Sequence, residues 1–405
     1  MEKNYGFGYS NIRLHHEQGV PPMTSKERVL KTLNHEEPDR VPYDLTSTLV
    51  TGIHYKAYER LREHLLLPKR KTRIFDLAQG LARVEEDMLD LLKVDTRGVL
   101  TGNPFGWELD VEQTPKYEQY KDVWGVVWRR PKPHGLYFDM VQHPLQGAGI
   151  DDLKGYDWPN PRDEHRLKGL KEEADGLRDS RCLIVLGTVG MTVGLLQQFQ
   201  FLMGYVDSYT ALAADPTLSS YMVQKLAELD IEFWEWAIPY LGDDIRVVLY
   251  ADDFGIQTGP MISYEMFERY FKPWYSKIFS VIKKQRPDLY IFFHTCGSSR
   301  YIIPDLIESG VDIINPVQYT AKDMDPKALK RDFGRDVTIW GGGIDTQKVL
   351  PRGSVQEVKD EVRRRIEDFA PGGGFVFNTV HNIQGDVPPE NIMAMWEALQ
   401  EYGVY

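Results

Sequence analysis

The sequence predicts a (β/α)8 barrel. Short runs of β-branched and aromatic residues alternate with longer stretches of helical period along most of the chain, and eight such runs can be counted. A doubly wound sheet would also alternate, but no G-x-G-x-x-G motif follows the first run. Because the chain of 405 residues has no linker rich in Pro, Gly or Ser, we expect one barrel domain over residues 24–405.

The first regular element is expected to start at Thr24. Residues 1–23 mix glycine, proline and aromatic residues without a period, which predicts an N-terminal extension that wraps the surface. The run T-S-K-E-R-V-L-K-T-L-N-H (24–35) then offers Thr24 or Ser25 as a helix cap and an acidic residue in the first turn. Its apolar side chains recur on one face, which predicts a short amphipathic helix.

The remaining elements follow in strict alternation. The expected strands are residues 40–45, 95–100, 182–188, 246–252, 289–294, 311–317, 337–341 and 375–379. The expected helices are residues 52–66, 82–93, 190–213, 216–241, 263–284, 299–309, 325–333, 354–369 and 389–402.

One long segment interrupts this alternation between the second and third strands. Its runs W-G-V-V-W-R-R (124–130) and L-Y-F-D-M (136–140) flank a turn, which predicts a β-hairpin within an insertion at 101–150. An insertion after a barrel strand lies on the carboxyl-end face, where it can cover a site. A decorative hairpin or a dimer contact would fit the same pattern.

Composition excludes some classes of function. The formal net charge of −12 would repel polyphosphate, so we expect no nucleic-acid partner and no anionic membrane surface. We find no apolar run of about 20 residues and no apolar signal core at the N-terminus, and therefore expect a soluble, cytoplasmic protein. Cys182 and Cys296 are the two cysteines, and we expect no disulfide between them.

Candidate metal ligands occur at the ends of two expected strands. The fifth, in L-Y-I-F-F-H-T-C-G (289–297), ends in His294 and Cys296, which are two residues apart and therefore point to the same side. His381 follows the eighth strand. In a (β/α)8 barrel these strand ends meet at one rim. The alternatives are a core cysteine beside a histidine bonded to its own backbone, and a capping or solvent role for His381.

Two imidazoles and one thiol form a donor set that zinc prefers. A catalytic zinc site holds three protein ligands and leaves a fourth position open, whereas a structural site would require further cysteines and a C-x-x-C pair. Four polar residues at the ends of the fourth and sixth expected strands are candidate catalytic residues. The two carboxylates among them would alternatively cap the following helix or pair with a cation. The four residues are Asp252, Asp253, Asn315 and Gln318.

The chain resembles the uroporphyrinogen decarboxylase superfamily, whose fold is a (β/α)8 barrel. The resemblance spans nearly the whole length and rests on five stretches. They are M-T-S-K-E-R-V-L-K-T-L-N-H-E-E-P-D-R-V-P (23–42), Q-T-G-P-M-I-S-Y-E-M-F-E-R-Y-F-K-P (257–273), F-H-T-C-G (293–297), W-G-G-G-I-D-T (340–346) and G-G-F-V-F-N-T-V-H-N-I-Q-G-D-V-P-P-E-N-I (373–392).

Two chemistries occur in that superfamily. Its decarboxylases carry an arginine-rich R-Q-A-G-R-Y loop after the first strand, whereas this chain reads Y-D-L-T-S-T-L-V (43–50) there. Without those arginines a polyanionic tetrapyrrole would meet repulsion on the order of several kcal/mol. Asp95 does fall near the region where the decarboxylases keep an essential aspartate.

The other branch comprises corrinoid-dependent methyltransferases, including those that transfer a methyl group from a methylcobamide protein to coenzyme M. Their zinc motif is H-x-C on the fifth strand with a further cysteine beyond the eighth. His294 and Cys296 match the first part, whereas His381 stands in the comparable later stretch and no cysteine follows residue 296. The resemblance therefore implies a Zn²⁺ ion on His294, Cys296 and His381, with the fourth ligand left open.

The implied activity is methyl transfer between a small O-, N- or S-methyl compound and a cobamide, with demethylation favoured. The nearest match to the corrinoid carrier motif D-x-H-x-x-G, at 163–169, is one residue too long, so we expect a separate corrinoid protein to supply the cobamide. The alternatives are a uroporphyrinogen-type decarboxylase and a non-catalytic tetrapyrrole-binding protein. The sequence leaves the methyl compound and the number of subunits open, and a homodimer is compatible with it.

Overall fold

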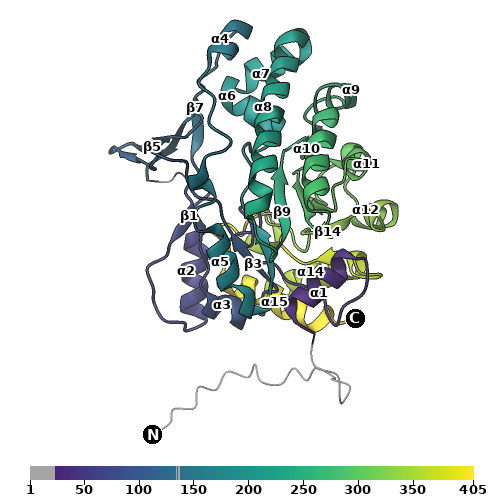
Figure 1. The fold of residues 1–405 in the computed structure, drawn as a ribbon. Helices are drawn as coiled ribbons and strands as arrows, with labels where there is room; N and C mark the ends of the chain where they lie inside the picture. The colour runs from purple at the N-terminus through teal and green to yellow at the C-terminus, as the bar shows by residue number, and fades with distance from the viewer. Residues whose placement is uncertain (1–22, 134, 136) are drawn as a thin grey trace.

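Parallel strands curl into a barrel at the centre of the molecule (Figure 1). The computed structural model describes residues 23–405 apart from 134 and 136. Residues 1–22 of the predicted extension at 1–23 therefore lie outside the described residues. The strands follow the order β15-β14-β13-β12-β9-β8-β3, and their pairing is parallel throughout. Their bounds are β3 Thr96–Val99, β8 Leu183–Leu186, β9 Ile245–Ala251, β12 Tyr290–His294, β13 Ile313–Asn315, β14 Thr338–Trp340 and β15 Phe375–Val376.

The first predicted strand, 40–45, closes the ring but is not a regular strand. It pairs with the segment after β15 through one parallel bridge, between Tyr43 and Phe377. On its other side the Asp95 amide donates to the Tyr43 carbonyl at 2.8 Å. Pro42 has no N–H to donate, and the Tyr43 N–H is taken by the Asp95 carboxylate at 2.8 Å, so a longer ladder cannot form. The predicted eight-position barrel is confirmed, with an irregular first position.

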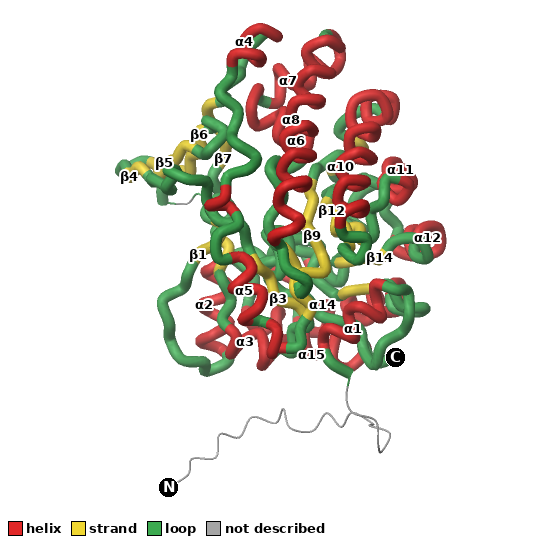
Figure 2. The backbone as a smooth tube through the Cα atoms, in the orientation of Figure 1, coloured by secondary structure: helices red, strands yellow, loops and turns green. Residues whose placement is uncertain are grey.

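Helices surround the barrel, as the red segments around the yellow strands in Figure 2 show. The helix α1 (Ser25–Leu33) begins with a capping box between Thr24 and Glu27, and its Val29 belongs to the buried cluster of the barrel interior. The other helices are α2 Tyr55–His64, α3 Glu86–Leu91, α4 Ile150–Gly155, α5 Leu170–Gly176, α6 Leu195–Met203, α7 Tyr205–Ala214, α8 Pro216–Ala237, α9 Tyr264–Met266, α10 Lys272–Gln285, α11 Ile303–Glu308, α12 Pro326–Phe333, α13 Val349–Arg352, α14 Val355–Phe369 and α15 Pro389–Tyr402.

Two predicted helices are broken in the structure. The helix expected at 190–213 is split into α6 and α7 at Gly204, whose φ of 82° interrupts the helical backbone. The helix expected at 263–284 consists of α9, a π-helical turn at Phe267–Phe271 and α10. Pro273 in the first turn of α10 lacks the N–H that a continuous helix would need, and this loss accounts for the wider turn before it.

The insertion forms a four-stranded antiparallel sheet. Its strands are β4 Glu112–Gln113, β5 Tyr117–Lys121, β6 Val127–Pro131 and β7 Asp139–Gln142. The predicted hairpin is confirmed as the pair β6 and β7, and the prediction missed β4 and β5, which extend the sheet on the β6 side. Trp128 packs edge-on against Phe201 of α6, with ring centroids 5.2 Å apart, and the Tyr137 hydroxyl bonds to the Gln384 side chain. The sheet therefore lies against the loops at the carboxyl end of the barrel.

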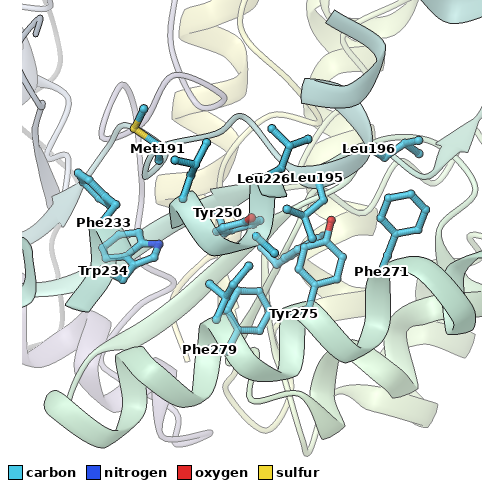
Figure 3. Close-up of a cluster of buried hydrophobic side chains, with 14 of the residues drawn as sticks. Met191, Leu195, Leu196, Leu226, Phe233, Trp234, Tyr250, Phe271, Tyr275 and Phe279 are labelled. Carbon is cyan, nitrogen blue, oxygen red and sulfur yellow. The ribbon is translucent and has the colours of Figure 1, made fainter. Parts of the chain in front are cut away.

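Aromatic side chains fill the core between the barrel and the outer helices (Figure 3). Tyr250 of β9 meets the rings of Tyr275 and Phe279 of α10 nearly edge-on, at centroid distances of 5.7 and 5.4 Å. Leu195 and Leu196 of α6 belong to the same buried cluster. Cys182 and Cys296 are not bonded to each other. Within residues 23–405, apart from 134 and 136, no helix is long and apolar enough to cross a bilayer.

The loop at 46–51 turns into the barrel rather than away from it. Gly98 in β3 and Gly187, directly after β8, leave room for it because they have no side chains. A Cβ atom at Gly98 or Gly187 would lie 2.3 or 2.1 Å from the Ser47 carbonyl oxygen, which is far below van der Waals contact. The loop position therefore depends on glycine at both sites.

We expect Gly187→Ala to destabilise the protein by about 1–3 kcal/mol, because the new methyl group would overlap a backbone oxygen that cannot rotate away. The midpoint of urea unfolding measures the change. Gly176→Ala in α5 is the matched control, since a Cβ there meets no atom within 4 Å, and it should keep or raise the midpoint. Equal midpoints for Gly187→Ala and the wild type would contradict the account of the loop.

Candidate metal centre

The structure brings the three predicted metal ligands together. His294 is the last residue of β12, Cys296 lies two residues further, and His381 lies five residues beyond the end of β15. The Cys296 Sγ is 3.3 Å from the His294 Nε2, and the rings of His294 and His381 have centroids 5.5 Å apart. One donor atom from each of the three residues lies within 4.8 Å of the donor atoms of the other two.

A buried asparagine fixes the orientation of the His294 ring. Asn315 at the end of β13 donates from Nδ2 to the Trp340 carbonyl at 2.7 Å, so its Oδ1 faces the Nδ1 of His294 at 2.5 Å. An amide oxygen can only accept, and Nδ1 must therefore carry the proton. The lone pair of Nε2 then points towards Cys296, which is the orientation that metal binding requires.

Burial sets the protonation of the donors. It lowers the pKa of His294 and of His381 to about 4, and the nearby His294 ring adds to the effect at His381. Both imidazoles are therefore neutral at pH 7, as metal ligands must be. Burial and the neighbouring Asp253 carboxylate raise the pKa of the Cys296 thiol well above its usual value. The thiol is therefore protonated until a cation replaces the proton.

The donor set fits a zinc ion. With Zn–N of about 2.0–2.1 Å and Zn–S of about 2.3 Å, tetrahedral geometry places donor atoms about 3.5 Å apart. The Sγ–Nε2 distance of 3.3 Å agrees with that spacing, and the outer limit of 4.8 Å requires only small side-chain movements. Two neutral imidazoles and one thiolate leave a fourth position for another ligand.

Asp252 points away from the three donors. Its carboxylate is buried at the start of α6, where it accepts hydrogen bonds from the amides of Leu196 and Gln197 at 2.7 and 2.8 Å and from the Tyr275 hydroxyl. Burial raises the pKa of Asp252 to about 8, against the opposing effect of these hydrogen bonds. The contacts are those of a helix cap, the alternative considered for this residue, although the helix precedes β9 rather than following it.

Asp253, the next residue, faces the donors. Its Oδ1 accepts a hydrogen bond from the Cys296 amide at 2.7 Å and lies 3.8 Å from the Nε2 of His294. Its Oδ2 accepts from the side chain of Gln197 at 3.2 Å. Burial raises the pKa of Asp253, while the Cys296 amide and His381 act in the opposite direction. Asp253 therefore borders the candidate metal position.

Gln318 holds the loop that carries Cys296. Its Oε1 accepts from the Gly297 amide at 2.9 Å, and its Nε2 donates to the Oε1 of Gln257 at 2.8 Å. These contacts fix the backbone directly after the thiol. Among the predicted catalytic residues, the structure thus places Asp253 and Asn315 against the donors and Gln318 one step behind them.

Sequence reasoning missed Asn382, which anchors the segment that carries His381. Its Oδ1 accepts from the Gly52 amide at 2.6 Å, and its Nδ2 donates to the Leu49 carbonyl at 3.0 Å and to the Oε1 of Gln79 at 2.8 Å. Its place beside His381 was a usable signal. No motif or period in the sequence singles out Gln79.

Comparisons with known proteins agree with this fold. A family model described as "Uroporphyrinogen decarboxylase (URO-D)" matches residues 140–402. A uroporphyrinogen decarboxylase of Geobacter sulfurreducens is 22% identical over 284 residues, which cover 66% of this chain and 76% of that protein. One from Legionella pneumophila is 24% identical over 176 residues, covering 44% of this chain and about half (47%) of that protein.

A solved structure described as a methyltransferase from Methanosarcina mazei superposes with a TM-score of 0.62. The superposition covers 94% of this chain and 99% of that one, at 19% sequence identity. At this identity the likeness establishes the shared barrel fold.

Titration of the metal-free protein with Zn²⁺ at neutral pH should release about one proton per ion bound. The two imidazoles are already neutral and contribute none, whereas the thiol gives up its proton. Calorimetry in buffers of different ionisation enthalpy measures this number. A value near zero would mean that Cys296 does not bind as thiolate.

We expect Asn315→Leu to weaken zinc binding by about 10-fold to 100-fold, because the His294 ring loses the acceptor that fixes its tautomer. Competition with a chelator measures the affinity. Asn391→Leu is the matched control, since Asn391 is a buried asparagine whose side chain donates to the carbonyls of Leu350 and Gly353, away from the three candidate ligands. Equal losses in both variants would argue for a general effect on folding.

Proposed function

The chain belongs to the uroporphyrinogen decarboxylase (URO-D) family, and within that family we propose that it is a zinc-dependent methyltransferase. The proposed reaction moves a methyl group between a small O-, N- or S-methyl compound and the cobamide of a separate corrinoid protein, with demethylation as the favoured direction. The observation that carries the proposal is the grouping of His294, Cys296 and His381 at one rim of the barrel.

Two further observations support methyl transfer. A structural relative with the same fold is described as a methyltransferase. The stretch 43–50, Y-D-L-T-S-T-L-V, contains no arginine that could neutralise a polycarboxylate. Both features agree with a small substrate that carries few or no negative charges.

The donor residues determine what the site can do. A bound zinc ion would act as a Lewis acid on the oxygen, nitrogen or sulfur that carries the methyl group. His294 and His381 would bind as neutral ligands and Cys296 as the single anionic one, so one net positive charge would remain to attract that heteroatom. This balance favours departure of an ether or alcohol oxygen over activation of a thiol.

The surrounding residues position the donors. Asn315 holds the His294 ring through Nδ1, and Asp253 holds the Cys296 backbone through its amide. When the methyl group leaves, the bonding electron pair stays on the heteroatom, which must then gain a proton. The carboxyl group of Asp253, whose pKa burial raises, lies 3.8 Å from the His294 Nε2 and borders the place where that proton is needed.

Decarboxylation of a porphyrinogen is the second candidate, because the curated relatives bear that name. Asp95 is the residue that resembles the essential aspartate of the decarboxylases. It directly precedes β3 and is buried at the amino-end side of the barrel, opposite the rim that carries the candidate ligands. Its carboxylate pairs with Arg28 and Arg40 at 2.6 and 2.8 Å. These contacts are those of a structural ion pair. A non-catalytic tetrapyrrole-binding protein is the third candidate.

Elemental analysis of the purified protein should find about one zinc ion per chain. His294→Ala and Cys296→Ala should each lose it while the helical content stays near that of the wild type, because a catalytic site is not needed for folding. His381→Ala should weaken zinc binding or methyl transfer to cob(I)alamin by about 10-fold to 100-fold.

Cys182→Ala is the control for these variants, because that buried thiol precedes β8 and bonds to the carbonyls of Val94 and Ser180. It should keep the full zinc content. Retention of one equivalent of zinc in both His294→Ala and Cys296→Ala would refute the site. Decarboxylase activity that survives chelation would favour the second candidate.

A further inference from the structure

Two largely exposed runs of opposite charge lie outside the candidate metal centre. The first, K-R-K-T-R (69–73), leads from α2 into the strand β1 (Ile74–Asp76), and four of its five residues are cationic. The second, E-L-D-V-E (108–112), ends in β4 of the insertion, and three of its five residues are acidic. The proposed methyl transfer uses neither run.

The backbone of both runs is free to pair. Residues 69–72 and 108–111 form no backbone–backbone hydrogen bond within the part of the chain that the structure describes. Among the described strands, β1 pairs only with β2 (Leu81–Ala82) and β4 pairs only with β5. Each run therefore adjoins an edge strand, and unpaired edges of this kind accept a strand from another chain.

The two runs have charges at matching intervals. Every second residue is charged, namely Lys69, Lys71 and Arg73 in the first run and Glu108, Asp110 and Glu112 in the second. Side chains two residues apart in a strand face the same side. When the runs pair with Lys71 opposite Asp110, every one of these cations therefore faces a carboxylate. Opposite charges across two strands stabilise the pairing.

Most of these charges have no partner in their own chain. Lys69 and Lys71 are exposed, and no described carboxylate lies within 4.0 Å of either amine. The exposed carboxylates of Glu108 and Asp110 likewise have no described cation within that distance. Arg73 differs, because its guanidinium pairs with the carboxylate of Glu85 at 3.1 Å. The four unpaired groups are thus available to a second molecule.

An exposed leucine accompanies each run. Leu66, which is 68% exposed, lines a groove together with α2 and the first run, and Leu109 of the second run is 43% exposed. Figure 2 shows β4 at the outer end of the insertion and the loop between α2 and β1 on the same, left-hand side of the barrel. A two-fold axis on that side brings each run of one copy to the opposite run of the other.

We propose that the run 69–73 of one chain pairs with the run 108–112 of a second copy, so that a two-fold dimer contains two such contacts. Each contact combines main-chain hydrogen bonds with pairs of opposite charge. At physiological salt, charges more than about 8 Å apart are largely screened, so the net charge of −12 on each copy opposes these close pairs only weakly. The interface does not depend on the methyltransferase reaction.

Sedimentation velocity of the full chain tests the proposal at about 0.15 M salt. Over concentrations of about 1–100 µM, the wild type should convert reversibly from single chains to dimers. At about 1 M salt, where the screening length falls to about 3 Å, the dissociation constant should rise by about 10-fold or more. A wild type that stays a single chain throughout this range, or a dimer that salt does not weaken, would overturn the proposal.

Charge reversal tests whether the contact lies at the two runs. Lys69→Glu combined with Lys71→Glu should raise the dissociation constant by about 100-fold, because like charges then face each other. Glu108→Lys combined with Asp110→Lys should have the same effect. An equimolar mixture of the two double variants should form dimers with about the wild-type affinity, since each reversed run then meets a run of opposite sign. A mixture that stays dissociated, or a reversal that leaves the constant unchanged, would refute the pairing.

Lys327→Glu combined with Arg331→Glu in α12 is the matched control for the first double variant. It changes the net charge by the same amount, at side chains that are 81% and 73% exposed. This control should keep the wild-type dissociation constant and, like the other variants, the wild-type circular dichroism. An equal loss of dimers in the control would show that net charge governs the association, and it would overturn the role of the two runs.

Discussion

One hydrogen bond, between the Oδ1 of Asn315 and the Nδ1 of His294, is the interaction on which the candidate centre depends. The second bond of Asn315, to the Trp340 carbonyl, connects three adjacent strands, β12, β13 and β14. These contacts hold the His294 ring in one orientation relative to the three strands, and they thereby fix the position of its Nε2 atom. A donor atom fixed in this way pays little entropy when it binds a cation.

Much of the fold was predictable because each strand and helix of the barrel has its own local pattern of apolar residues. Seven of the expected strands and the long outer helices follow from runs such as 289–294 and 354–369, whose apolar pattern is unambiguous. The failures have local causes that a period does not reveal. Pro42 left 40–45 without a ladder, and Gly204 and Pro273 interrupted two helices.

The candidate site was predictable only in part. The three donors stood out because few residue types bind zinc and because strand ends converge at one rim. The supporting side chains did not. Asn315 and Gln318 were noticed for their position but not for their partners, and Asn382 and Gln79 act through contacts that span more than 300 residues. Such contacts exist only once the ring has closed.

Asp252 and Asp253 illustrate how one strand end serves two purposes. Neighbouring side chains of an extended chain face opposite sides, so the Asp252 carboxylate binds the first turn of α6 while the Asp253 carboxylate borders the candidate metal position. The pairing of Ala251 with His294 sets the register of β9, and this register determines that Asp252 faces α6 and Asp253 faces the rim. A slip of β9 by one residue would turn the anchoring acid towards the rim and leave the helix uncapped. Two adjacent aspartates with different roles thus require a sheet whose strand register is fixed.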